Sequence, residues 1–129
     1  MSIKRKRLSQ KERQQVWQKC NGHCAYCGCK LPYNKMHVDH VRSINHAQWE
    51  KIRTGKIDED INEMDNLLPA CGSCNRYKHC QGLEEFRDWM TTIVSRLRHN
   101  NVTYQIAERY GLVQEIKWDG KFYFERIKV

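Results

Sequence analysis

Residues 9–20 are mostly polar, with two adjacent apolar residues late in the stretch, and they begin with a helix-start signal. Ser9 stands at the beginning of this stretch and Glu12 follows it by three residues, which is the pattern of a capping box. A helix is therefore expected over residues 9–20. Val16 and Trp17 are the residues of this helix that we expect to face the core.

A longer amphipathic stretch follows Gly82. Apolar residues recur there every three or four positions, at Leu83, Phe86, Trp89, Met90, Ile93, Val94 and Leu97. This spacing predicts one helix over residues 84–99 with an apolar face that packs on a core. A shorter helix is expected over residues 102–110.

The end of the chain contains a turn signal. Asp119-Gly120 is typical of the two-residue turn of a β-hairpin. Residues 112–118 and 121–129 would be the two strands. Residues 83–129 are therefore expected to extend the main domain as helix and β-hairpin.

The middle of the chain contains two short strand candidates, residues 36–41 and 66–70. A helix is expected over residues 44–53 between them, and another over residues 73–80 after the second strand. This order of two strands and a helix, with further helices around it, predicts an α+β fold. Residues 45–64 are interpreted as a segment inserted between the strands.

Length and composition narrow the class of protein. The chain has 129 residues, of which 40% are hydrophobic, which suits one domain with a modest core. No apolar run approaches the ~18 residues that span a bilayer, so no membrane partner is expected. Residues 1–10 are basic but lack the apolar stretch of a secretory signal. A cytoplasmic location is therefore expected, where thiols stay reduced.

The formal net charge of +8 favours a polyanion such as nucleic acid as the partner. Four basic residues stand together near the N-terminus: Lys4, Arg5, Lys6 and Arg7. We expect residues 1–8 to be a flexible basic arm in front of a domain core at residues 9–82. The arm is either a solvated tail or a segment that contacts phosphates once nucleic acid binds. Arg76 and Lys78 are further candidates for phosphate contacts.

Seven cysteines in so short a chain require an explanation. Cys24-x-x-Cys27 and Cys71-x-x-Cys74 have the spacing that lets each turn supply two thiolates to a tetrahedral Zn²⁺. A closed four-thiolate site has no open position, so one structural zinc ion per chain is expected. An iron–sulfur cluster is the main alternative, and redox disulfide chemistry is a weaker one.

Three cysteines, Cys20, Cys29 and Cys80, lie outside these pairs. We interpret them as small buried apolar residues. Cys29 stands two residues after the first pair, so it could compete as a ligand, but the matched pairs fit better.

A carboxylate, an imidazole and two carboxamides stand close to the cysteine pairs: Asp39, His40, Asn66 and Asn75. Asp39 and Asn75 offer oxygen ligands, which Mg²⁺ and Mn²⁺ prefer. A neutral His40 can take a proton from water near pH 7. In a regular strand Asp39 and His40 would face opposite sides, so a shared site requires the strand to end there. The alternative for Asn75 is that it caps a helix.

The stretch from Cys24 to Lys78 resembles the HNH endonuclease family with its ββα-metal motif. The matching segments are the first C-x-x-C pair, Val38-Asp39-His40-Val41, and Asn66-Leu67-Leu68-Pro69-Ala70-Cys71-x-x-Cys74-Asn75-x-x-Lys78. Asparagine at position 75 corresponds to the H-N-N variant of the family. Ser43 stands where the family often has a proline.

The resemblance implies a metal-dependent endonuclease that hydrolyses phosphodiester bonds, with double-stranded DNA as partner and products that carry 5′-phosphates. It implies His40 as the general base and Asn66 as the residue that holds the loop carrying His40. It also implies Asp39 and Asn75 as ligands of a catalytic Mg²⁺ or Mn²⁺ ion. A phage or mobile-element context is typical of small proteins of this family.

A second hypothesis comes from another functional class, a zinc-ribbon module that binds nucleic acid without cutting it. Binding alone does not require a carboxylate beside a histidine at a zinc-held site. Asp39, His40 and Asn75 therefore favour the nuclease.

Overall fold

The computed structural model describes residues 2–129. Its internal contacts divide the chain into two compact units. The first contains the residues up to Leu83 together with Phe122–Val129, and the second contains Glu84–Lys121. Within the described residues, no helix combines the length and apolar character that crossing a membrane requires.

Helix α1 (Gln10–Gln18) opens the first unit. Ser9 is its N-cap, and the side chains of Ser9 and Glu12 each accept a hydrogen bond from the other's backbone N–H at 3.1 Å. The capping box expected from the sequence is thus confirmed. Val16 is fully buried and belongs to a core cluster with Leu31, Met36 and Leu67. This core anchors α1 beside the sheet.

A two-stranded antiparallel sheet follows, formed by β1 (His37–His40) and β2 (Leu67–Ala70). The register pairs His37 with Ala70 and His40 with Leu67. A one-turn 3₁₀ helix precedes each strand, η1 (Tyr33–Lys35) and η2 (Met64–Asn66). Every residue of β2 is buried, which explains why so short a strand is stable.

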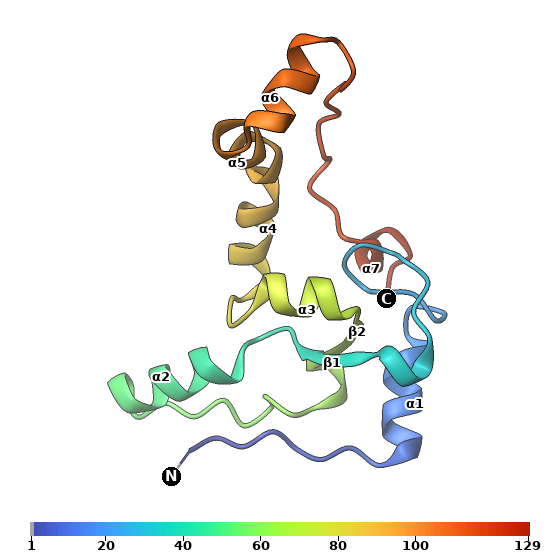
Figure 1. Cartoon of the computed structure of the whole chain (residues 1–129). Helices are drawn as coiled ribbons and strands as arrows, with labels where there is room; N and C mark the ends of the chain where they lie inside the picture. The colour runs from blue at the N-terminus through green and yellow to red at the C-terminus, as the bar shows by residue number, and fades with distance from the viewer. Residues whose placement is uncertain (1) are drawn as a thin grey trace. The chain divides into compact units, whose positions relative to one another are not determined.

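Helix α3 (Gly72–Lys78) comes directly after β2, so the two strands and this helix form a ββα unit (Figure 1). Helix α2 (Ile44–Thr54) lies between the strands in sequence, as expected. The Ser43 hydroxyl caps α2 by accepting from the backbone N–H of His46 at 3.3 Å. Gly55 ends α2 with a φ of 75°, a conformation that glycine adopts without strain. The fold is therefore α+β with a ββα core, as expected from the sequence.

The second unit contains α4 (Leu83–Thr91, which begins at the unit boundary), α5 (Ile93–Asn100) and α6 (Val102–Arg109). The prediction of a single helix over residues 84–99 is wrong, because the helix is interrupted at Thr92, between α4 and α5. The hydroxyls of Thr91 and Thr92 donate to the carbonyls of Asp88 and Trp89, at 2.7 and 3.1 Å. Such side-chain hydrogen bonds compete with the helix ladder.

The β-hairpin expected around Asp119-Gly120 is also wrong. The turn itself forms, since the Asp119 carboxylate accepts from the backbone N–H of Lys121 at 3.1 Å. No strand flanks it, however, and the chain continues into α7 (Tyr123–Arg126). The backbone N–H groups of Tyr123 and Phe124 donate to the carbonyls of Tyr26 and Ala25, at 3.1 and 2.8 Å. We call the two turns formed by residues 24–27 and 71–74 the first and second cysteine knuckles. Hydrogen bonds to the backbone of the first knuckle thus take the place of strand pairing.

Candidate functional site

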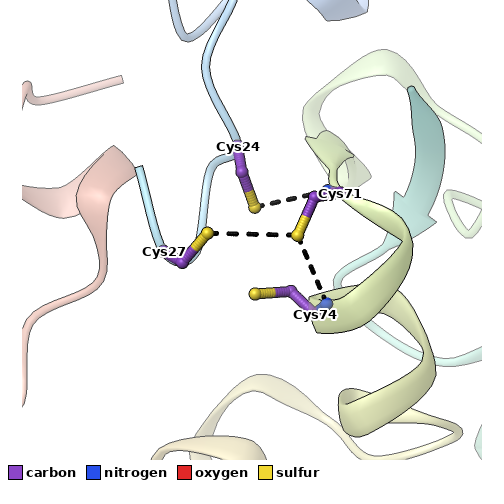
Figure 2. A group of neighbouring side chains, drawn as sticks. All are labelled: Cys24, Cys27, Cys71 and Cys74. Atoms are coloured by element: carbon purple, nitrogen blue, oxygen red, sulfur yellow. Dashed lines mark hydrogen bonds between the residues drawn. The ribbon is translucent and has the colours of Figure 1, made fainter. Parts of the chain in front are cut away.

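Four thiols from two distant segments meet in the first unit. Cys24 and Cys27 lie on the loop after α1, and Cys71 and Cys74 lie at the start of α3 (Figure 2). All four sulfur atoms lie within 4.8 Å of one another. Tetrahedral zinc with Zn–S bonds near 2.3 Å requires S–S separations of roughly 3.8 Å. The Sγ atoms of Cys27 and Cys71 are 3.9 Å apart, so the cluster fits one metal ion.

Backbone N–H groups donate hydrogen bonds to two of the four sulfur atoms in this cluster. Cys71 is the N-cap of α3 and its sulfur accepts from the backbone N–H of Cys74 at 3.4 Å. The backbone N–H of Cys71 in turn donates to the sulfur of Cys24 at 3.4 Å. A hydrogen bond with the Cys74 thiol, and then those from the backbone N–H groups of Cys71, Cys27 and Tyr26, lower the pKa of Cys24. The thiolate is the form that binds metal, so these hydrogen bonds favour ligation by Cys24.

The three remaining cysteines have different environments. Cys20 is fully buried, as expected, and burial raises the pKa of its thiol to about 11. Cys29 and Cys80 are exposed, so their interpretation as buried apolar residues is wrong. Cys29 lies beside the thiols of Cys27 and Cys71, because the first knuckle turns back towards the cluster at Gly28.

A second group of side chains lines a pocket of about 290 Å³ beside the sheet. Asp39 and His40 come from the end of β1, and Asn75 comes from α3. Asp39 and His40 reach the same pocket although they are adjacent, because His40 is the last residue of its strand. The three side chains named in the sequence are therefore brought together.

Asp39 is held by two buried donors. Its Oδ2 atom accepts from the Tyr26 hydroxyl at 2.5 Å and from the Lys78 ammonium at 3.0 Å. Burial, and then the Asp39 carboxylate, raise the pKa of Tyr26, so its hydroxyl stays protonated and donates. Lys78 also donates to the backbone carbonyl of His40 at 3.1 Å. These contacts fix both the carboxylate and the backbone that carries His40.

The expected phosphate contact of Lys78 is wrong. Its side chain is 0% exposed and its charge is paired with Asp39. The ammonium of Lys78 contacts Asp39 and His40 of β1 and is fully buried, so it cannot reach a phosphate in solvent. Lys78 is a structural ion-pair partner.

Removing this ammonium should destabilise the fold. In Lys78→Met the buried Asp39 charge loses its partner, and breaking a buried pair costs ~3–5 kcal/mol. Arg76→Met, an exposed position on the same helix, should change stability by less than about 0.5 kcal/mol. Urea denaturation of the zinc-loaded variants measures both values. Equal, small effects would contradict the assignment of Lys78 as a buried ion-pair partner.

His40 is buried at 7% exposure and its two ring nitrogens differ. Nε2 lies 2.9 Å from the Oδ1 atom of Asn62. Nδ1 is buried and has no hydrogen-bond partner within residues 2–129. Burial lowers the pKa of His40, although the hydrogen bond with Asn62 acts in the opposite direction. The imidazole is therefore suited to be neutral near pH 7 and to accept a proton.

Asn66 is 2% exposed and makes three hydrogen bonds across the loop after His40. Its Oδ1 accepts from the backbone N–H of Arg42 at 2.8 Å. Its Nδ2 donates to the carbonyls of Arg42 and Ile61, at 3.2 and 2.8 Å. A single carboxamide therefore ties the chain after His40 to the segment before β2.

Asn75 occupies the second turn of α3 and not its cap. Cys71 is the N-cap of this helix, so the interpretation of Asn75 as a capping residue is wrong. Asn75 is half-buried and lines the pocket with Asp39. Its carboxamide is thus available as an oxygen donor at the pocket.

The basic arm lies along the first unit. Arg5 lines the pocket, as does the exposed Arg76 of α3. Lys6 forms an exposed ion pair with Glu12 at 2.9 Å, and Lys4 and Arg7 are exposed. Two arginines therefore line the same pocket as Asp39 and His40.

Sequence reasoning missed three residues of this site. Tyr26 stands inside the first cysteine pair, where no pattern marks it as a partner of Asp39. Asn62 stands in an acidic stretch that resembles an ordinary loop. His79 follows α3 with a φ of 54° and lines the pocket. No sequence pattern marks His79.

Comparison with known proteins extends these observations. Residues 24–81 match the family model described as HNH endonuclease. The chain is also similar to YoqL of Bacillus subtilis (strain 168), a protein derived from the SPbeta prophage whose name classes it as a candidate HNH endonuclease. The identity is 31% over an alignment of 88 residues. The match covers 54% of this chain and 30% of the relative. The match thus spans less than a third of the relative's length.

Proposed function

Because residues 24–81 are an HNH endonuclease domain, we propose that this chain is a metal-dependent endonuclease that hydrolyses phosphodiester bonds in DNA. One observation carries the proposal: a buried imidazole with a free ring nitrogen lines the same pocket as a carboxylate and a carboxamide. A module that only binds nucleic acid has no use for this combination.

The four-thiolate cluster is proposed to hold one structural Zn²⁺ ion. Its ligands close the coordination sphere, so it has no position for a substrate. Its role is mechanical, because Cys71 and Cys74 begin the helix that carries Asn75. The ion would tie the first knuckle to the residues around the pocket.

Asp39 and Asn75 are proposed to hold a catalytic Mg²⁺ or Mn²⁺ ion. Both offer hard oxygen donors at one pocket, which suits these ions. Tyr26 and Lys78 both bind Oδ2 of Asp39, so Oδ1 is the oxygen proposed as the ligand. When bound, the ion would stabilise negative charge on the scissile phosphate and the leaving oxygen.

His40 is proposed as the general base. Burial favours its neutral form, and Nδ1 is the ring nitrogen without a partner among residues 2–129. It would take a proton from the water that attacks phosphorus. Asn66 would keep the loop after His40 in the position this requires.

The basic side chains are proposed to bind the substrate backbone. Arg5 and Arg76 line the pocket and can pair with phosphate oxygens near the scissile bond. Lys4, Lys6 and Arg7 would extend the contact along the arm, and such contacts weaken as salt increases.

Cleavage of matched labelled substrates tests the proposal. Duplex DNA, single-stranded DNA and RNA of one sequence are incubated with the zinc-loaded chain and Mg²⁺, and binding is followed by gel shift in parallel. Cutting of DNA with 5′-phosphate ends is expected. Binding without cutting of any substrate would instead support a zinc-ribbon binding module.

Substitution of Asn75 tests the metal ligands. Asn75→Ala should lose activity by more than about 10-fold, since Asp39 alone would hold the ion loosely. Asn75→His should retain some activity but shift its preference towards Co²⁺ or Ni²⁺, which bind imidazole better. Rates are measured across Mg²⁺, Mn²⁺, Co²⁺ and Ni²⁺, with Ser73→Ala on the exposed side of α3 as the control. A full-rate Asn75→Ala enzyme would remove Asn75 from the metal site.

A further inference from the structure

We propose that Asn62, held by the backbone of the basic arm, is a positioning residue that sets the tautomer of His40 and thereby leaves Nδ1 as the base. The inference rests on the proposed role of His40. Asn62 belongs to the segment between α2 and η2. It is not part of any motif identified in the sequence analysis. Its carboxamide contacts the arm on one side and His40 on the other.

The arm determines which way the Asn62 carboxamide points. The backbone N–H of Lys6 can only donate, and it lies 3.1 Å from Oδ1 of Asn62. The backbone carbonyl of Lys4 can only accept, and it lies 3.0 Å from Nδ2 of Asn62. Exchanging the oxygen and nitrogen of the carboxamide would break both hydrogen bonds, so the orientation is assigned by backbone chemistry.

This orientation in turn assigns the proton on His40. Oδ1 of Asn62 has two lone pairs, one for Lys6 and one for Nε2 of His40, which lies at 2.9 Å. Because Oδ1 cannot donate, the hydrogen bond requires a proton on Nε2. In a neutral imidazole the other nitrogen, Nδ1, then carries the lone pair. Nδ1 is the buried nitrogen that has no partner within the described chain.

The arm consequently has a second role besides its charge. The backbone of residues 3–6 contacts other parts of the first unit, since the N–H of Ile3 also donates to the side chain of Gln48 at 2.5 Å. Arg5 stands between Lys4 and Lys6, the two arm residues that hold Asn62, and it lines the pocket. Phosphate bound by the arm would therefore stabilise the same backbone that orients the base.

The test combines kinetics with a spectroscopic readout. The ¹⁵N chemical shifts of the His40 ring report its tautomer, and kcat and KM are measured on duplex DNA. The wild type should show the Nε2-protonated form. Asn62→Ala should give a mixture of tautomers and lower kcat by roughly 10–100-fold, the effect of losing a partner that orients a histidine, with zinc retained. Asn34→Ala, at an exposed site in η1, is the matched control.

A second pair of variants isolates the arm. Lys6→Pro removes the backbone N–H that binds Asn62, whereas Lys6→Ala removes the same charge and keeps the N–H. The proline variant should show the mixed tautomer and a lower kcat than the alanine variant. This pair also tests the inference if Asn62→Ala does not fold.

The outcomes separate this inference from the proposed function. A wild type that cuts DNA, together with variants that keep its kcat or its His40 tautomer, overturns the role of Asn62 alone. A wild type that never cuts overturns the nuclease, and the ring ¹⁵N shifts then still decide whether Asn62 sets the tautomer.

Discussion

Replacing His40 by alanine should reduce DNA hydrolysis by roughly 10²–10⁴-fold, the usual contribution of a general base. The imidazole would be lost from a pocket in which it is buried at 7% exposure beside Asp39. The four thiols lie outside this change, so zinc content should be retained. Single-turnover rates on duplex DNA, with zinc measured in the same samples, check this prediction.

The neighbouring histidines provide matched controls for His40. His37 precedes it by three residues on β1, and His46 lies in the first turn of α2. Both are exposed, so His37→Ala and His46→Ala should keep most of the rate. If His37→Ala abolished cleavage while His40→Ala did not, the base would have been assigned to the wrong face of the strand.

Loss of a zinc ligand should unfold much of the first unit. Cys24→Ser or Cys71→Ser should abolish stoichiometric zinc binding, and metal binding contributes ~10–16 kcal/mol of folding free energy in small zinc sites. The two knuckles join the loop after α1 to the start of α3, and no large core replaces that connection. Metal analysis and circular dichroism of the purified variants measure the effect.

Cys80→Ser is the control for this experiment, because Cys80 is exposed and is not one of the four clustered thiols. It should bind one zinc ion per chain and keep its helix content. A Cys24→Ser protein that remains folded without zinc would show that the cluster is dispensable for the fold.

Features with short sequence spacing could be predicted from the sequence. The capping box of Ser9 and Glu12 formed as expected, because its partners are three residues apart. The two C-x-x-C pairs also came together, since one turn brings each pair of thiols to one side. Asp39, His40 and Asn75 line one pocket. The first two end β1, and Asn75 directly follows Cys74 of the second cysteine pair in α3.

Features that depend on distant partners could not be predicted. Asn62 contacts His40 across 22 residues and Lys4 across 58, and no local pattern encodes either contact. Lys78 was assigned to solvent because charged residues are seldom buried unless they are paired, and its partner Asp39 lies on another element. The Asp119-Gly120 turn was identified, but the residues after it bind the first knuckle instead of forming a strand.

The dependence of plasmid nicking on Mg²⁺ shows whether this chain is a metal-dependent nuclease. Zinc-loaded protein freed of other divalent ions is mixed with supercoiled DNA, and Mg²⁺ is titrated while bound zinc is monitored. We expect no nicking without Mg²⁺ and a rate that rises to saturation as Mg²⁺ fills the site proposed at Asp39 and Asn75. DNA that is bound but never nicked, with Mg²⁺ or with Mn²⁺, would contradict it.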